Sequence, residues 1–219
     1  MNRIRVVVVV LVMLVLACTT TSAAGPIKFG VKAGWSFAKQ TWEYARYLGT
    51  VERDQRTGLA VGLFADMAVT PAVGLRGEFL YVQKGNQVEV PYRTYAGPAG
   101  TLTFKDRIDY LSIVATGKLN LTRQPVGVYL LAGPRLDIKL STSSDIDSPA
   151  TDSLIDSYKA TVPGLTFGGG LEKTVGSFGT VLLEFRYDYD FADAIKYVGT
   201  ENELTVSNKG FSILAGLRF

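Results

Sequence analysis

Charged residues occupy every second position of one stretch near the end of the chain. Glu184, Arg186, Asp188 and Asp190 alternate there with large apolar residues. Pairs of carboxylates at this spacing could do acid/base chemistry, and Asp188 with Asp190, or Glu184 with Asp188, are the candidates. The other interpretation is that these acids form ion pairs with a basic neighbour such as Arg186. We favour ion pairing.

Other catalytic chemistry finds little support in the sequence. The chain contains no histidine, and no zinc-binding cluster, nucleophile elbow or phosphate-binding loop is recognisable. The run Gly168-Gly169-Gly170 lacks the Lys-Ser/Thr pair that follows in phosphate loops, so it indicates close backbone approach or strand bending. We therefore predict no catalytic residue, no metal site and no cofactor.

Further charged residues alternate with apolar ones along the whole chain. Because both signs are nearly balanced, these residues predict a buried network of ion pairs, since an unpaired buried charge costs several kcal/mol. An ion-conducting or solute-conducting channel lined by the same residues is the alternative. The predicted network consists of Lys32, Asp66, Arg76, Glu78, Lys118, Arg135, Asp137, Lys139, Glu172, Glu184, Arg186, Asp188 and Arg218, with Lys28, Lys84 and Asp190 on the same faces.

The elements that must position these charges are strands, because apolar residues recur with a period of two. The register of 73–84 is the least certain, since Leu80 and Val82 interrupt its polar face, and Pro134 predicts a bulge or a local opening of the ladder. The eight predicted strands are 27–37, 59–67, 73–84, 111–121, 126–141, 165–172, 181–191 and 210–219.

The connections between these strands alternate in length. Long polar connections at 39–57, 85–106, 142–160 and 192–209 alternate with short ones at 70–71, 122–125 and 176–179. All long connections therefore lie at one end of the sheet, as in transmembrane β-barrels. The residues of 39–57, which include Trp42 and Tyr44, could instead extend the strands.

Strand length and aromatic placement favour lipid as the solvent of the apolar faces. Most of the predicted strands have about 9–11 residues, enough to cross a bilayer at a tilt. Aromatic residues gather at the long-connection end (Trp35, Phe37, Tyr81, Tyr187, Tyr189 and Phe191) and at the short-turn end (Phe29 and Phe219). We predict an all-β fold, an eight-stranded antiparallel up-and-down transmembrane β-barrel whose last strand closes onto 27–37. A soluble lipocalin-like barrel is the structural alternative.

The first 24 residues have the three-part pattern of a secretory signal peptide. Arg3 and Arg5 precede an apolar run, and Ser22-Ala23-Ala24 forms a small-residue cleavage site. The run is too short for a transmembrane helix, which needs about 20 residues. We predict a signal peptide over 1–24 and a barrel domain over 25–219. Lipid attachment at Cys18, the only cysteine, is an alternative to its removal.

Four segments together resemble a known protein family. IKFGVKAGWSF, LRGEFLYVQKG, YLLAGPRL and the terminal LAGLRF are similar to the small outer-membrane β-barrels of Gram-negative bacteria, the OmpX-like and PorT-like proteins. The resemblance implies an eight-stranded barrel in the cell outer membrane, with the carboxy-terminal Phe219 read by the barrel assembly machinery. Enzymes among small barrels use a histidine, which this chain lacks.

We therefore expect a non-enzymatic outer-membrane protein. Its roles would be envelope integrity, adhesion or surface recognition through the long connections. A narrow pore or secretion accessory, and a rim-located hydrolase without histidine, remain alternatives. Expected partners are outer-membrane lipid and lipopolysaccharide, the assembly machinery, and an extracellular protein or glycan. After removal of the signal the chain has 21 basic and 20 acidic residues, so no nucleic-acid partner is expected. We expect a monomer.

Overall fold

The chain forms a single antiparallel β-sheet that closes on itself. The computed structural model describes residues 25–44, 49–52, 54–94, 97–122, 125–144, 159–191, 195–198 and 203–219. The predicted signal peptide over 1–24 lies outside the described residues. Within them, no helix is long and apolar enough to cross a membrane.

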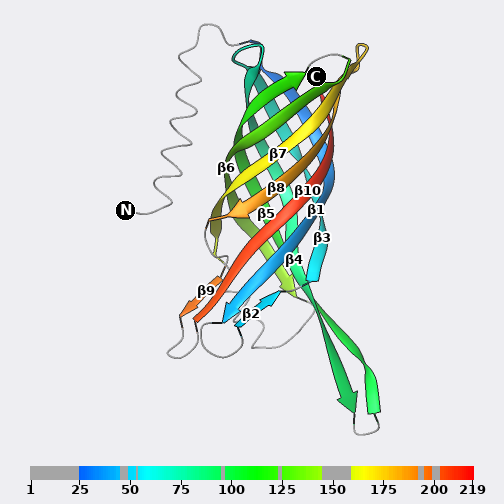
Figure 1. The fold of residues 1–219 in the computed structure, drawn as a ribbon, viewed down its shortest axis with the longest axis vertical. Coiled ribbons are helices and arrows are strands. Elements are labelled where there is room, and N and C mark those ends of the chain that lie inside the picture. The colour runs from blue at the N-terminus through cyan, green and yellow to red at the C-terminus, as the bar shows by residue number, and fades with distance from the viewer. Residues whose placement is uncertain are drawn as a thin grey trace.

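Eight long strands form the barrel, and each pairs with its neighbours in sequence. They are β1 (Lys28–Tyr44), β3 (Asp54–Ala68), β4 (Val73–Thr94), β5 (Gly97–Thr122), β6 (Gly127–Ser144), β7 (Thr161–Val175), β8 (Gly179–Asp190) and β10 (Glu203–Arg218). Two short strands, β2 (Gly49–Glu52) and β9 (Ile195–Val198), add to the ends of β1 and β10. Figure 1 shows the tilted strands, with the chain end C among the short turns.

Pairing of β1 with β10 closes the barrel, as the sequence predicts. The ladder runs without a register shift from Gly30–Arg218 to Tyr44–Leu204. Beyond it, the amide of Phe219 donates a hydrogen bond to the carbonyl of Phe29, at 2.8 Å. The closed, all-antiparallel architecture confirms the predicted fold class.

Turn chemistry explains the short connections. The hydroxyl of Thr70 accepts a hydrogen bond from the amide of Val73 at 2.9 Å, which stabilises the turn between β3 and β4. Gly176 begins the turn between β7 and β8 with φ of 52°, a left-handed conformation that favours glycine. Both turns occur where the sequence predicts them.

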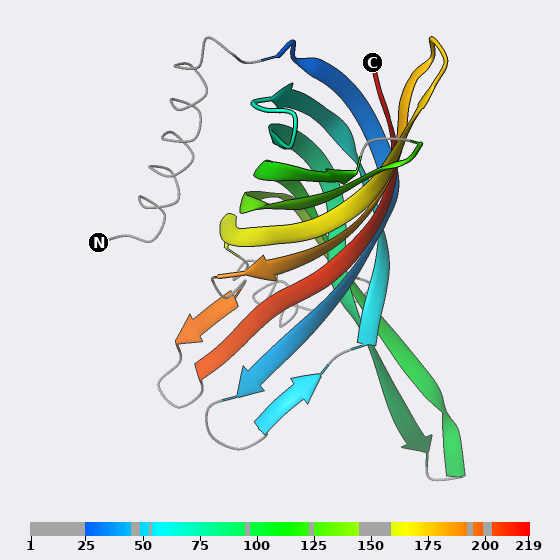
Figure 2. The same ribbon diagram turned by 45° about the horizontal axis from the view of Figure 1, so that its top comes forward.

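The long connections were predicted as loops, and for three of them this was largely wrong. Most of 192–209 belongs to β9 and to the beginning of β10. Residues 85–106 form the far ends of β4 and β5, which pair as far as Thr94–Gly97. Residues 39–57 mostly belong to β1, β2 and β3, in agreement with the alternative that they extend the strands. Figure 2 shows the β4–β5 hairpin projecting well beyond the barrel wall. Most of 142–160 lies outside the described residues.

Pro134 opens the ladder locally, as predicted. The β5–β6 pairing is interrupted between Val114–Arg135 and Gly117–Ala132, and it resumes in the same register. Proline has no amide hydrogen to donate, so the interruption follows from its chemistry. Strict alternation along 126–141 would place Ser141 on the interior face with Lys139, but a register shift between Asp109 and Tyr110 places Ser141 opposite Asp109 instead.

Candidate functional site

The charged residues that alternate along the strands lie on the interior face of the barrel. Alternate residues on the outer face are apolar and exposed, among them Phe29, Leu63 and Phe185. Leu80 and Val82 are buried in the interior, which settles the register left open for this strand. Of the predicted network, Lys32, Asp66, Arg76, Glu78, Lys118, Arg135, Asp137, Glu184 and Arg186 are buried, whereas Lys139, Glu172, Asp188 and Arg218 are half-buried.

Glu184 and Glu78 are the acidic centre of a first ion cluster, nearer the short turns. Arg186 donates to Glu184 from Nε at 2.9 Å and to Glu78 from Nη2 at 2.6 Å. Lys32 Nζ lies 2.8 Å from Glu78 and 3.2 Å from Glu184. Glu184, Glu78, Lys32 and Arg186 are each 4% exposed or less, so these pairs are formed away from water. Such a cluster is stable only if every member is paired.

Arg76 links this centre to the mouth of the barrel. Its guanidinium donates to Asp66, with Nη2 to Oδ2 at 2.8 Å, and also donates to Glu184. Asp66 in turn accepts a hydrogen bond from Arg218 Nη1 at 2.8 Å. A bidentate arginine–carboxylate pair fixes the side chains in direction as well as in distance. Arg76 therefore holds strands from opposite walls together.

A cavity of about 570 Å³ opens at the short-turn end of the barrel. Lys118, Glu172 and Arg218 form part of its lining. Lys118 Nζ lies 2.7 Å from Glu172, and Arg218 Nη1 lies 3.0 Å from the same carboxylate. Lys28, predicted to face the interior, also lines this cavity and is exposed. The cavity is thus a mouth bounded by ion pairs.

Two interior aromatic rings support the arginine, a role that sequence analysis missed. The Arg76 guanidinium carbon lies 4.5 Å from the ring centre of Phe64 and 5.4 Å from that of Tyr129. The Tyr129 hydroxyl donates to Glu184 at 2.8 Å. A Cβ added to Gly30 would lie 2.3 Å from the Phe64 ring, so this glycine makes room for it. An aromatic residue at an interior position, paired with glycine on the next strand, was the available signal.

A second ion cluster lies nearer the long strand ends. Lys84 Nζ lies 2.6 Å from Asp137, and Arg135 Nη1 lies 3.1 Å from Asp137 and 3.2 Å from Asp188. Arg135 also donates to Asp190. The basic partner of Asp188 and Asp190 is therefore Arg135 rather than Arg186, the neighbour considered from sequence.

Hydroxyl groups complete this second cluster. Ser112 donates to Asp137 at 2.5 Å, and Thr166 donates to Asp188 at 2.7 Å. Asp137 and Asp188 therefore each interact with both a cationic side chain and a hydroxyl group, which fixes their positions in the interior. Within the described residues, no group of three or more histidine, cysteine or acidic side chains is placed to hold a metal ion.

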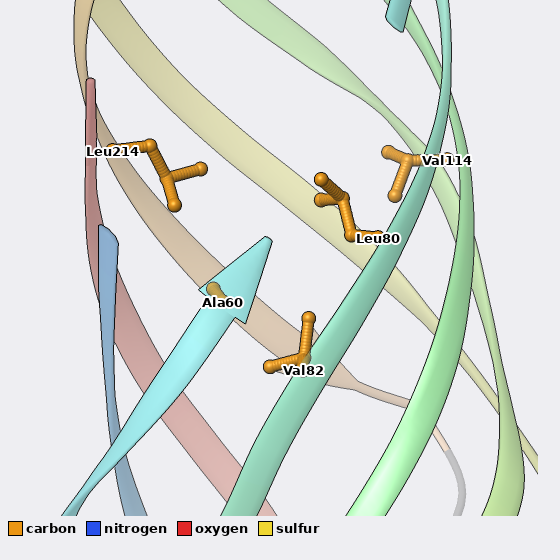
Figure 3. Close-up of a cluster of buried hydrophobic side chains, with 5 residues drawn as sticks. All are labelled: Ala60, Leu80, Val82, Val114 and Leu214. Carbon is orange, nitrogen blue, oxygen red and sulfur yellow. The ribbon is translucent and has the colours of Figure 1, made fainter. Parts of the chain in front are cut away.

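Apolar side chains fill the interior between the two ion clusters. Figure 3 shows Ala60, Leu80, Val82, Val114 and Leu214 pointing into the barrel from β3, β4, β5 and β10. All five are 5% exposed or less. Toward the long strand ends, a cavity beside Ser36, Lys84 and Asp188 has a volume of only about 10 Å³, too small to hold more than one water molecule. An eight-stranded barrel has an interior just wide enough for side chains, and here they occupy it.

Aromatic side chains lie on the outer face at both ends of the barrel, as predicted. Phe37 of β1 stacks on Phe211 of β10 with ring centres 4.6 Å apart, and Tyr189 meets Phe191 edge to face at 6.0 Å. Phe219 and Phe178 are exposed at the short-turn end. Aromatic rings at two levels are typical of the interfaces of a membrane.

A polar chain on the outer face was missed by sequence analysis. The Tyr81 hydroxyl accepts from Arg107 Nη2 and from Gln83 Nε2, both at 3.0 Å. Arg107 Nε donates to Asp109 at 2.9 Å, and Ser141 donates to the same carboxylate at 3.0 Å. These residues follow directly after the apolar outer face of β4 and β5. They show where that face stops being apolar.

The chain is similar to known proteins in sequence and in fold. A family model described as the outer membrane protein beta-barrel domain matches residues 9–219. No curated protein matches the chain. Among solved structures, OprG from Pseudomonas aeruginosa is similar over 88% of this chain and 95% of its own, with 14% identity and a TM-score of 0.50. Neisserial surface protein A shares 21% identity over 89% of this chain and 100% of its own, with a TM-score of 0.45.

Proposed function

Because the chain belongs to the outer membrane protein beta-barrel family, we propose that it anchors a protein-recognition surface in the outer membrane. The barrel lies in the lipid bilayer, its short turns face the periplasm and its long strand ends face outward. In this proposal the filled barrel does no chemistry and conducts no solute. Recognition or adhesion takes place on the strand ends beyond the membrane.

The filled interior is the observation that carries the proposal. Two ion clusters and the apolar cluster between them occupy the barrel along its length, and Arg76, Glu184 and Leu214 are each 1% exposed or less. The periplasmic cavity ends against the pairs that Asp66 and Glu172 form with Arg218. This packing supports a barrel that serves as a rigid anchor, and it speaks against the narrow-pore alternative.

The acids considered for catalysis are engaged in the same packing. Arg135 and Thr166 hold Asp188, and Arg135 and Lys84 hold Asp190 and Asp137. A general base must lie within reach of substrate, whereas Asp190 is 7% exposed and Asp137 is 1% exposed. This arrangement supports a non-enzymatic function over a rim-located hydrolase.

The charge of the outer segments supports a protein partner. Residues 39–57, 85–106, 142–160 and 192–209 together contain nine basic and twelve acidic residues, a net charge of −3. A surface of this sign repels sulfated glycans and lipid phosphates. Aromatic residues such as Trp42 and Tyr44 are enriched at protein interfaces. We therefore favour a protein over a glycan as the extracellular partner.

Three further assignments belong to the same proposal. The segment 1–24 acts as a signal peptide, and Phe219 is read by the barrel assembly machinery. Lipopolysaccharide surrounds the outer half of the barrel. The closed β1–β10 seam supports a barrel built from one chain.

Shortening the β4–β5 hairpin tests this function. We would replace residues 87–105 by Asn-Gly, a two-residue hairpin turn, and measure adhesion of displaying cells to surfaces coated with extracellular proteins. Heat-modifiable gel migration of both proteins is the control for barrel folding. We expect adhesion to fall at least tenfold while the migration is kept. Equal adhesion by the shortened and full-length proteins, or no adhesion by either, would overturn the proposal.

A further inference from the structure

The mouth cavity, which opens at the short-turn end of the barrel, is lined by more basic than acidic side chains. It lies beside the β3–β4 turn, among the short turns at the top of Figure 1. Its charged lining consists of Lys28, Lys118, Arg218, Asp66 and Glu172, and Phe219 is absent from the lining. An excess of one positive charge therefore faces the cavity.

The first ion cluster, which lies behind the cavity, does not supply the missing negative charge. Arg76 donates to Asp66 at 2.8 Å and also to Glu184, so it draws on the same carboxylates. The mouth cavity and this cluster together hold six basic and four acidic side chains, a net charge of +2. They are Lys28, Lys32, Arg76, Lys118, Arg186 and Arg218, with Asp66, Glu78, Glu172 and Glu184. Because a buried charge without a counter-charge is costly, an anion that enters the cavity would stabilise the cluster.

Two cations of the mouth share the same two carboxylates. Lys118 Nζ lies 2.7 Å from Glu172 and 3.5 Å from Asp66. Arg218 Nη1 lies 3.0 Å from Glu172 and 2.8 Å from Asp66. Both hydrogen bonds of Arg218 thus leave from one nitrogen, and its Nε has no hydrogen-bond partner in the part of the chain that the structure describes. The guanidinium, which has five N–H donors, keeps donor capacity for a further acceptor.

Lys28 adds an exposed positive charge at the edge of the mouth cavity. Among the described residues it forms no ion pair. Gly25 also lines the cavity, and its amide donates to the carbonyl of Ala68 at 2.9 Å. Removal of 1–24, as proposed above, would leave the α-ammonium group of Gly25 at this place. Both groups would attract an anion toward Lys118 and Arg218.

We propose that the mouth cavity binds a phosphate monoester group, carried by a soluble ester or by a lipid headgroup. Such a group carries a charge of about −1.5 to −2 at pH 7 and three acceptor oxygens, so it matches the surplus of two positive charges better than one carboxylate does. Arginine and lysine are the side chains that bind phosphate groups. The volume of about 570 Å³ lies within the range of small-ligand sites, about 300–1,000 Å³. This site goes beyond the proposed recognition surface, because it lies at the opposite end of the barrel.

Isothermal titration calorimetry with inorganic phosphate tests the site. The folded protein in phosphatidylcholine nanodiscs is titrated at constant ionic strength, because salt screens interactions between exposed charges. We expect saturable binding of one phosphate per barrel and at least tenfold weaker binding of acetate. Heat-modifiable migration verifies that the protein and each variant are folded.

Three variants distinguish this site from general charge attraction. Lys28→Gln should weaken phosphate binding at least threefold. Lys173→Gln is the matched control and should leave binding unchanged, because Lys173 is an exposed lysine of β7 that does not line the cavity. Glu172→Gln removes a carboxylate that competes for Lys118 and Arg218, so it should tighten phosphate binding at least threefold.

Absence of saturable phosphate binding, or equal losses in Lys28→Gln and Lys173→Gln, would overturn the proposal. Weaker binding by folded Glu172→Gln, or acetate binding as tight as phosphate binding, would overturn it too. Nanodiscs that contain phosphatidic acid identify the source of the group. Loss of phosphate binding in these nanodiscs would support the site with a lipid headgroup as its ligand, and unchanged binding would support it with a soluble ester.

Discussion

Arg186 donates two hydrogen bonds to Glu184, two residues earlier on the same strand, at 2.9 Å from Nε and 2.6 Å from Nη2. Residues at i and i+2 share one face of a strand, so this pair is formed by β8 alone. Both side chains also reach across the interior, Arg186 to Glu78 and Glu184 to Lys32. The pair therefore joins local structure to the packing of opposite walls.

Losing both members of this pair should cost less than the two single losses added together. Glu184→Gln leaves Arg186 buried with one partner fewer, and loss of one member of a buried pair costs about 3–5 kcal/mol. We expect Glu184→Gln with Arg186→Met to cost less than the sum of the two single variants. Urea unfolding of the reconstituted protein measures all four stabilities. A coupling energy of zero would show that the pair does not act as a unit.

The interior glycine beside Phe64 should not tolerate a side chain. A Cβ on Gly30 would lie 2.3 Å from the Phe64 ring, which supports Arg76, whereas nothing lies within 4 Å of a Cβ on Gly77. We expect Gly30→Ala to destabilise the barrel by about 1–3 kcal/mol, as overpacking does. Gly77→Ala, on the lipid-facing side, is the matched control and should be neutral or slightly stabilising. Equal losses in the two variants would contradict the packing described.

A charge on the lipid-facing side should destabilise the folded barrel only where it lies deep in the bilayer. Phe185 is exposed at mid-strand, and Phe178 is exposed in the turn between β7 and β8. We expect Phe185→Arg to reduce the free energy of folding into lipid vesicles by about 2–4 kcal/mol and Phe178→Arg by about 0–1 kcal/mol. Similar effects at both positions would mean that the apolar face does not meet lipid.

Accessibility along β1 should rise beyond Phe37, which stacks on Phe211 on the outer face. Single cysteines at Phe37 and Glu43 lie on the same side of the strand, six residues apart. With a membrane-impermeant maleimide on intact cells, we expect labelling of Glu43→Cys and at least tenfold less labelling of Phe37→Cys. Strong labelling of both, or of neither, would place the membrane boundary elsewhere.

The strands and their closure could be predicted from sequence because period two is a local property. The final strand was expected to close onto 27–37, and Phe219 bonds to Phe29 at that seam. Arg218 was expected in the interior near the rim, and it lies beside Asp66 and Glu172 there. Each of these inferences needed only alternation and strand order.

Partner choice in the interior could not be predicted in the same way. The basic residue that pairs with Asp188 depends on how β6 is aligned along its axis with β7 and β8. Alternation within one strand gives no information on that alignment. Ser141 departs from strict alternation because of the register shift beside Tyr110, and such a shift cannot be read from the sequence of one strand. Residues 85–106 were taken for a loop because they separate two strong apolar alternations, although they continue the β4–β5 ladder as far as Thr94–Gly97.

The central claim is that side chains fill the barrel, so that it conducts no ions. Single-channel recording in planar lipid bilayers tests this claim most directly. The purified, heat-modifiable protein should give no current steps, because the ion clusters around Glu184 and Arg135 and the apolar cluster around Leu214 fill its interior. Reproducible current steps from the folded protein, absent from a heat-denatured sample, would contradict the claim and favour a transport function.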